Sequence, residues 1–179
     1  MVSGGNFHGQ PIALAFDRAA AALASLAGVC ERRVFQVVSG GGPGLPMFLA
    51  EDPGLQSGFM IVQYTAAALA SELKTLAHPA AADSIPTSAN KEDFVSMGMW
   101  GALKLRRAVD AAAGVVAVEL LAAAQGVECH RPLKPGRGVA EALHRLRARA
   151  ARSHGDESLS ERLETVRAMV LAGAFGGIA

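Results

Sequence analysis

The chain has 179 residues, of which 51% are hydrophobic and only 5% aromatic, and its formal net charge is +1. This balance gives no electrostatic reason to expect a nucleic-acid partner. The two cysteines are too few for a disulfide framework, which makes a reducing compartment the default. The first residues lack a signal-peptide pattern, and the longest apolar run near the middle, 111–118, is too short to span a bilayer. We therefore expect a cytoplasmic protein without a membrane partner.

Helical periodicity dominates the first half of the chain. A long helix with one apolar face is predicted, with Pro11 in its first turn and a glycine-rich segment, 39–43, at its end. The apolar residues of this face are Ile12, Phe16, Ala19, Leu23, Leu26, Cys30, Val34 and Val37. A second apolar stripe runs from Val62 to Leu76 and predicts another helix, which Pro79 would stop.

The second half of the chain also has a helical pattern. A third helix is predicted from near Asn90 to about Gly126, and Gly114 could bend or divide it. Two further helices are predicted over 139–152 and 160–172. The sequence has no β-type alternation of useful length.

The fold class predicted from these patterns is all-α, a bundle of long helices. We expect one all-α unit over 1–179, with a helical core at approximately 8–126 and a C-terminal helical segment at approximately 137–175. Alanine runs make the three long helices apolar around much of their circumference, which is typical of helices buried on several faces. Partners from outside the chain could cover these faces, or a self-contained bundle could use alanine for tight packing.

The segment from Asp83 to Gly98 contains two adjacent acids at the expected start of the third helix. Asn90 is a strong helix N-cap, and the helix dipole would favour the negative charges of Glu92 and Asp93 in the first turn. A carboxylate held there could accept a hydrogen bond from an imidazole or pair with a cation. From spacing alone, a capped and solvated helix start is the simpler alternative. The five histidines show no metal-ligand spacing, so no metal site is predicted.

Three segments, in this order, resemble the aromatic amino-acid ammonia-lyases, and within them the histidine ammonia-lyases. They are 3–11 (SGGNFHGQP), 57–72 (SGFMIVQYTAAALASE) with its continuation at 76–79, and 83–98 (DSIPTSANKEDFVSMG). The resemblance implies the C-terminal part of a helical fold that forms tetramers around shared long helices. It implies a C-terminal portion or small subunit of a histidine-ammonia-lyase-like enzyme. The chain is expected to be oligomeric, either with an N-terminal lyase half or large subunit or with itself.

The resemblance implies that Phe7, Met60 and Glu92 bind the substrate, a small amino acid. Phe7 would lie against the substrate, Met60 would line the pocket, and Glu92 would contact an imidazole. The last role is physically reasonable, because a carboxylate can accept imidazole N–H groups but would stay unpaired against a benzene ring. Without the resemblance, Met60 would be ordinary core filler and Phe7 a staple at a helix entry. His8 is predicted to be a structural histidine rather than a catalyst.

Two positions depart from the family's pattern. Lys91 stands where the family normally has glutamine, and Phe94 where histidine lyases usually have histidine. Lys91 could pair with Glu92 or point outward, because neighbouring residues on a helix diverge. We expect Lys91 to be a possible modifier of the pocket, and the exact amino-acid substrate stays open.

The family uses an electrophile, a methylidene-imidazolone, made by cyclisation of an internal Ala-Ser-Gly tripeptide, and this sequence contains none. The resemblance places the family's catalytic tyrosines and carboxylate-binding arginine in earlier segments. We therefore expect no catalytic residue in this chain, the electrophile on a partner chain or a missing segment, and an inactive isolated chain. Complemented, the chain would take part in the non-oxidative elimination of ammonia from L-histidine to urocanate. The alternatives are a non-catalytic assembly partner of a lyase and an inactive truncated fragment.

Overall fold

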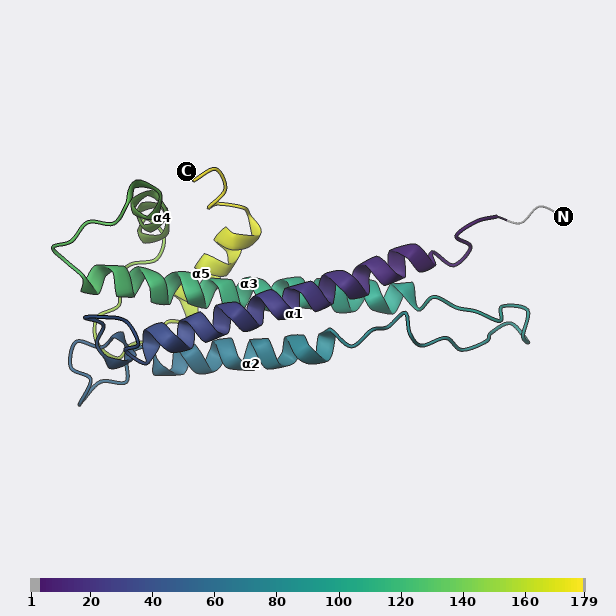
Figure 1. The fold of residues 1–179 in the computed structure, drawn as a ribbon, viewed down its shortest axis with the longest axis horizontal. Helices are drawn as coiled ribbons and strands as arrows, with labels where there is room; N and C mark the ends of the chain where they lie inside the picture. Colours follow the sequence, from purple (N-terminus) through teal and green to yellow (C-terminus); the bar gives the residue numbers. More distant parts are fainter. Residues whose placement is uncertain (1–3, 179) are drawn as a thin grey trace.

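The computed structural model describes residues 4–178, and in that range it contains five α-helices, one short 3-10 helix and no β-strand. Three long helices form an elongated bundle: α1 (Gln10–Val38), α2 (Met60–Leu76) and α3 (Gly98–Cys129) (Figure 1). The 3-10 helix η1 (Met47–Leu49) lies between α1 and α2, and the shorter helices α4 (Arg137–Arg147) and α5 (Ser160–Leu171) follow α3. The prediction of an all-α bundle of long helices is confirmed.

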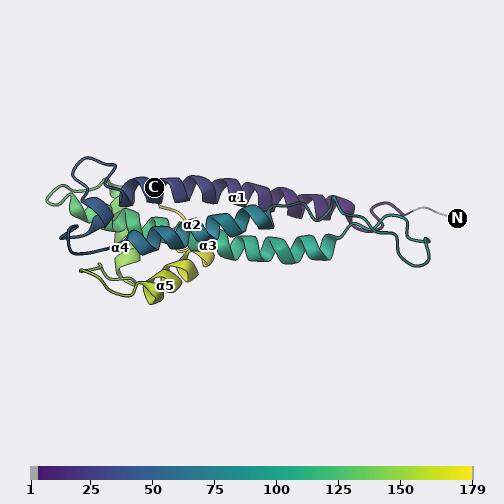
Figure 2. The ribbon, with the colours of Figure 1, turned by 90° about the horizontal axis from the view of Figure 1, so that it is seen from below.

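The direction of the helices places the connecting segments at two opposite ends of the bundle. α1 and α3 run in the same direction and pack directly against each other, and α2 runs back in the opposite direction beside them (Figures 1 and 2). We call one end the loop end, because residues 4–9 and the connection 77–97 both lie there. The other end holds η1 and the start of α2, and we call it the η1 end. The side chains confirm this arrangement, since Gly98 lies beside Ala13 and Gly126 beside Leu49.

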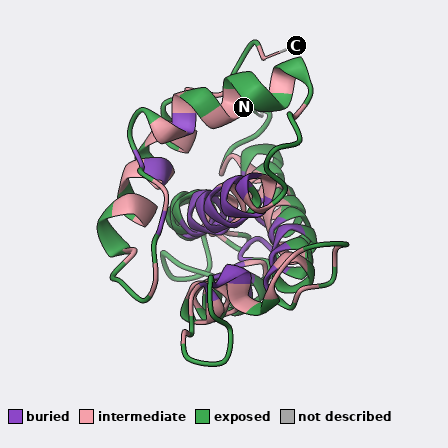
Figure 3. Ribbon diagram, turned by 90° about the vertical axis from the view of Figure 1, so that its left-hand side faces the viewer, coloured by how far each residue is buried: buried purple, intermediate pink, exposed green. Residues whose placement is uncertain are grey.

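The core is built around α3. In the half of α3 from 111 to 128 most residues are buried, because α1, α2 and the C-terminal helices surround it (Figure 3). The first half of α3 is covered on one side only. The largest fully buried side chains belong to α1, α2, α3, α4 and α5 together: Leu73, Leu121, Leu146, Val34, Val115, Val118, Val166 and Cys30. The C-terminal helices therefore complete the core rather than forming a separate one.

α1 faces this core with small side chains. Ala13, Ala20, Ala27 and Val34 recur every seven residues, and each is at most 3% exposed. Small side chains allow the backbones of packed helices to approach closely. The predicted apolar face was partly wrong, because Leu26 is 50% exposed. Close packing selected the alanine stripe and left Ile12 and Leu26 toward solvent, whereas Leu23 packs against the core.

The predicted start of the third helix near Asn90 was also wrong. Ser88, Ala89 and Asn90 have φ angles of 53°, 52° and 65°, in the left-handed region, from which a right-handed helix cannot continue. On either side of this turn, Thr87 and Glu92 exchange two backbone hydrogen bonds, of 3.0 and 3.3 Å. Asn90 is therefore a turn residue and not an N-cap, and Glu92 lies outside the helix.

The remaining boundaries agree more closely with the sequence. α1, α2 and α5 have nearly their predicted bounds, whereas α4 ends at Arg147 and does not continue to 152. α3 is one helix through Gly114, where a Cβ atom would lie 2.8 Å from Cδ1 of Leu69. Gly114 therefore makes room for a side chain of α2 instead of dividing the helix. The extent of the predicted unit, 1–179, stays a prediction.

By length and composition alone, α1 and α3 could each cross a membrane. The most apolar window of α3 is 67% buried inside the bundle, which is typical of the core helix of a globular protein. The corresponding window of α1 is 17% buried, and its alanine stripe packs against that core. The predicted absence of a membrane partner stays a prediction.

The alanine stripe of α1 can be tested by a matched pair of substitutions. Ala27→Leu should lower the free energy of unfolding by about 1–3 kcal/mol, because the larger side chain overpacks a buried position. Ala22→Leu, at an exposed position of the same helix, should change it by less than about 0.5 kcal/mol. Urea unfolding followed by circular dichroism would measure both. Equal effects would show that α1 does not use this face.

Candidate functional site

The loop end brings together two of the three resembling segments. Phe7 lies in a turn before α1, and its side chain is 81% exposed. The rings of Phe7 and His8 pack edge to face, with 4.4 Å between the ring centroids. A hollow of about 550 Å³ lies between this turn, the first turns of α1 and the connection 77–97. Its lining residues are Asn6, Phe7, His8, Gln10, Pro11, Leu14, Arg18, Asp93 and Phe94. Ser3, the first residue of the resembling segment, lies outside the described residues.

Side chains of α1 and α3 anchor the start of the connection 77–97. The two carboxylate oxygens of Asp17 accept hydrogen bonds from the backbone N–H groups of Ala80, at 2.9 Å, and Ala81, at 2.7 Å. Lys104 of α3 is buried, and its ammonium group donates to the carbonyl oxygen of His78. A long loop is thereby fixed to two helices before it turns outward (Figure 1).

Within the loop, a hydroxyl group holds the carboxylate of Glu92. Thr87 Oγ1 donates to Glu92 Oε2 at 2.7 Å, in addition to the backbone bonds between these residues. Glu92 is partly buried and does not line the hollow, whereas Asp93 and Phe94 do. Lys91 is exposed, and in residues 4–178 it forms no ion pair with Glu92 or any other acid.

Met60 lies far from the other predicted site residues. It is the first residue of α2, at the η1 end, whereas Phe7 and Glu92 are at the loop end. The 29 residues of α1 separate the two ends by about 40 Å, at about 1.5 Å per residue. A single chain therefore brings Phe7 near the Glu92 loop but does not bring Met60 to either.

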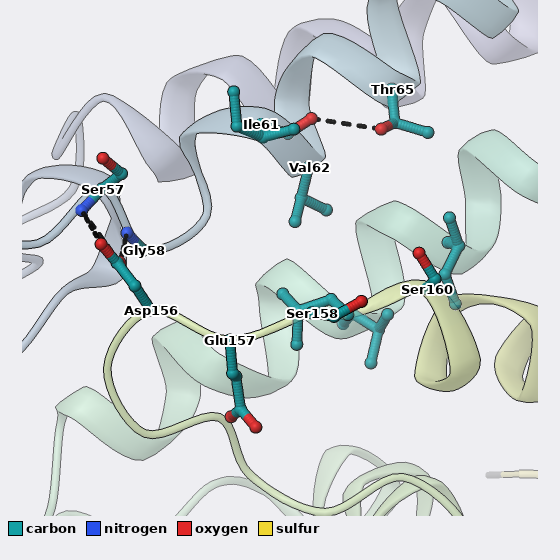
Figure 4. A pocket seen from close by; sticks show the side chains of 12 residues that line it. Ser57, Gly58, Ile61, Val62, Thr65, Asp156, Glu157, Ser158 and Ser160 are labelled. Carbon is teal, nitrogen blue, oxygen red and sulfur yellow. Dashed lines mark hydrogen bonds between the residues drawn. The ribbon is translucent and has the colours of Figure 1, made fainter.

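The C-terminal segment holds the start of α2. The Asp156 carboxylate accepts hydrogen bonds from the N–H groups of Ser57, at 3.0 and 3.1 Å, and Gly58, at 2.8 Å (Figure 4). Ser57 and Gly58 directly precede the N-terminus of α2, where negative charge is favourable. Ser57, Gly58 and Asp156 themselves line a second hollow, of about 390 Å³, whose apolar lining residues include Val62 and Leu121. Asp156 thus fixes the turn that leads into Met60.

The loop that presents Asp156 is itself well held. The guanidinium of Arg162, the backbone N–H of His154 and the hydroxyl of Ser153 all donate to Glu157, and they lower its pKa to about 2. Glu157 therefore stays charged, and these contacts stay intact, at any pH near neutrality. A second tie to the core comes from Gln125 of α3, whose amide donates to the Ser153 carbonyl at 3.1 Å.

Neither cysteine is prepared to act as a nucleophile. Burial, with a hydrogen bond to Glu119, raises the pKa of Cys30 to about 11, and burial also raises the pKa of Cys129. Both thiols are therefore protonated near neutral pH, and the thiolate is the reactive form. In the described range, 4–178, no three His, Cys, Asp or Glu side chains are grouped as metal ligands. The prediction of no metal site stays a prediction.

Comparison with known proteins decides the family. The model of the family described as aromatic amino acid lyase matches residues 1–148. The chain belongs to the aromatic amino acid lyase family. Its similarity continues past residue 148, since two curated histidine ammonia-lyases match nearly the whole chain. Identity is 53% over 175 residues with the protein of Anaeromyxobacter sp. (strain K) and 49% over 173 residues with that of Myxococcus xanthus.

These matches cover 98% and 97% of this chain but 34% of each relative, so the chain spans about a third of their length. The crystal structure of histidine ammonia-lyase from Trypanosoma cruzi has a TM-score of 0.92 and 40% identity, over 97% of this chain and 34% of that one. A tyrosine aminomutase from Streptomyces globisporus has a TM-score of 0.91 and 36% identity, over 96% and 33%. The matches are consistent with the predicted C-terminal part of a histidine-ammonia-lyase-like protein.

The residues of this chain do not fit the electrophile of aromatic amino acid lyases. That group is made by cyclisation of an internal Ala-Ser-Gly tripeptide. Two tripeptides that share two of these residues are Ala70-Ser71-Glu72, in the middle of α2, and Gln56-Ser57-Gly58, where Asp156 holds the amides. Neither has the required residues.

The sequence missed several residues of the loop-end hollow. Gln10 and Arg18 lie on α1, Asp93 follows the predicted Glu92, and only their places in the fold bring them together. The sequence did carry a signal for Asp93, because Glu92 and Asp93 were recognised as adjacent acids. Only Glu92 was assigned to the substrate site. For Gln10 and Arg18 no signal existed, because ordinary polar residues on a helix are usually solvated.

Removal of the Asp156 carboxylate should loosen the start of α2. Asp156→Ala should lower the free energy of unfolding by about 1 kcal/mol, because two backbone donors lose their acceptor. Asp83→Ala is a matched control, because Asp83 is exposed in the connection at the other end. Urea unfolding and hydrogen exchange of residues 57–62 would measure the effect. An unchanged exchange rate in that segment would contradict the role given to Asp156.

Proposed function

We propose that this chain forms one wall of the substrate pocket of a histidine-ammonia-lyase-like enzyme. The reaction is the non-oxidative elimination of ammonia from L-histidine to give urocanate. The observation that carries the proposal is the position of Phe7 beside the Glu92 loop, at one end of a chain 53% identical to a histidine ammonia-lyase. The electrophile belongs to a partner chain or a segment outside this sequence.

The chain's own residues bind and orient the substrate. Thr87 donates to one oxygen of Glu92, which leaves the other oxygen to accept an imidazole N–H. The exposed ring of Phe7 supplies an aromatic face for the planar substrate. Phe94 lies in the same hollow, so the pocket wall is more apolar than a histidine at this position would make it. These groups would orient the substrate toward reactive atoms on another segment.

The separation of Met60 from Glu92 supports a pocket shared between copies of the chain. If Met60 lines the same pocket, it comes from the η1 end of a second copy, placed beside the loop end of the first. Large apolar side chains exposed along α1 and α3 supply a surface for such an assembly. They include Ile12, Leu26, Val29, Met99, Trp100 and Leu103. The oligomer so proposed is cytoplasmic.

A second candidate is a non-catalytic partner that assembles with a complete lyase. Phe94 favours it, because this residue occupies the hollow where histidine lyases usually carry a histidine. Such a partner would co-purify with the lyase and leave its activity unchanged when Glu92 is replaced by alanine.

Reconstitution tests the proposed function directly. The chain should be co-expressed with the two thirds of the Anaeromyxobacter histidine ammonia-lyase that it does not match, and urocanate followed by ultraviolet absorbance. We expect turnover from the pair and none from either part. Glu92→Ala should lower kcat/KM by about tenfold or more, because it removes a charged hydrogen-bond acceptor. Asp83→Ala serves as the control. A stable complex without turnover would reject the catalytic proposal.

Mixed assemblies test the shared pocket. Met60→Glu, which should repel Glu92, and Glu92→Ala should each abolish most activity. Because these residues come from different copies, a mixture of the two variants should restore about a quarter of the sites. Phe7→Ala mixed with Glu92→Ala is the control, since both residues come from one copy and no mixed site is intact. Equal recovery in the two mixtures, or none in either, would contradict the shared arrangement.

A further inference from the structure

Two segments meet at the loop end without belonging to a common helix. Residues 4–9 carry Phe7, and the connection 77–97 carries Glu92 (Figure 1). A hydroxyl group joins them, because Ser96 Oγ donates a hydrogen bond to the carbonyl oxygen of His8 at 2.5 Å. In residues 4–178 this is the one hydrogen bond between the two segments.

Ser96 is placed to connect three parts of the fold. It is 4% exposed, and its oxygen also accepts a hydrogen bond from the N–H of Gly98, at 3.3 Å, at the first residue of α3. The backbone of Gly98 lies close to Ser96 and to α1. A Cβ atom on Gly98 would lie 3.3 Å from Ser96 Oγ and 3.6 Å from the Ala13 methyl group, so a side chain there would require Ser96 to shift slightly. The hydroxyl of Ser96 thus ties the turn before α1, the end of the loop and the start of α3.

The position of Phe7 depends on this contact. Its side chain is 81% exposed and meets the His8 ring, so the core does not hold it. The turn itself is closed by a hydrogen bond from the N–H of Gly9 to the carbonyl of Asn6, at 2.9 Å. That bond fixes the shape of the turn but not its position relative to the loop. The bond from Ser96 to His8 supplies the second constraint.

We propose that Ser96 is a positioning residue that sets the place of Phe7 relative to the Glu92 loop. Its contribution to substrate binding rests on the proposed function; its contribution to the geometry does not. Replacing Ser96 by alanine leaves the partly buried His8 carbonyl without its donor and releases the turn. The aromatic wall and the carboxylate then fluctuate independently, and substrate binding weakens although no group that touches the substrate has changed.

Ser84 offers a matched comparison. Its Oγ accepts a hydrogen bond from the N–H of Val95 at 2.9 Å, so it closes the base of the same loop. It makes no hydrogen bond to residues 4–9 within the described range. Ser84→Ala removes a serine hydroxyl from the loop but leaves the connection to the Phe7 turn. Ser25→Ala, in an exposed part of α1 where the hydroxyl bonds to its own helix, controls for the substitution itself.

The experiment has two measurements. In the full chain, amide hydrogen exchange should become about tenfold faster for residues 6–12 in Ser96→Ala, with α2 and the end of α3 unchanged. Ser84→Ala and Ser25→Ala should leave that segment at the parent rate. In the reconstituted assembly described above, Ser96→Ala should raise KM by about tenfold and change kcat by less than about twofold, because the electrophile is not in this chain.

The outcomes separate this proposal from the proposed function. Unchanged exchange in residues 6–12 would overturn the role of Ser96, whatever the activity. Faster exchange with unchanged KM in an active assembly would also overturn it as a positioning residue. If the parent assembly has no turnover, the proposed function fails, and the exchange measurement alone decides the geometry. A general loss of protection throughout the bundle would mean a folding defect of the variant and would count against a local connection.

Discussion

The close approach of α1 and α3 is the constraint on which the rest of the structure depends. It is made by the small residues of α1, which recur every seven positions and let the two backbones pack tightly. A bidentate ion pair from Arg33 of α1 to Glu119 of α3, at 2.5 and 3.0 Å, fixes their register. Because the two helices run in the same direction, both begin at one end, and the segments before them must lie side by side.

This geometry explains how residues far apart in sequence share one hollow. Phe7 precedes α1, Asp93 precedes α3, and both helices start at the loop end. The intervening loop is then held at its start by Asp17 of α1, and at its end by the hydrogen bond from its own Ser96 to the turn before α1. The loop-end hollow is therefore a consequence of the parallel pair, with side-chain hydrogen bonds adding the local detail.

The same geometry separates two of the residues that we propose for the pocket. Because α2 runs back along the bundle, its first residue, Met60, lies at the opposite end from Glu92. A length of about 40 Å cannot be bridged by side chains. Large apolar residues are exposed along α1 and α3, and we propose that further copies of the chain cover them. The proposed sharing of the pocket between copies of the chain follows from this separation.

The sequence by itself determined the helical class, most helix bounds and the family, because periodicity and local motifs are carried by neighbouring residues. It also identified Phe7, Met60 and Glu92 as candidates. It could not place them, since the end of the bundle at which each residue lies depends on helix direction. It misplaced the start of α3, because a capping pattern at Asn90 cannot show that three successive residues turn left-handed. Only the tertiary structure decided the end of the bundle at which each candidate lies and the start of α3. It also decided which face of α1 is buried, because close packing of whole helices, and not local propensity, selects among several apolar faces.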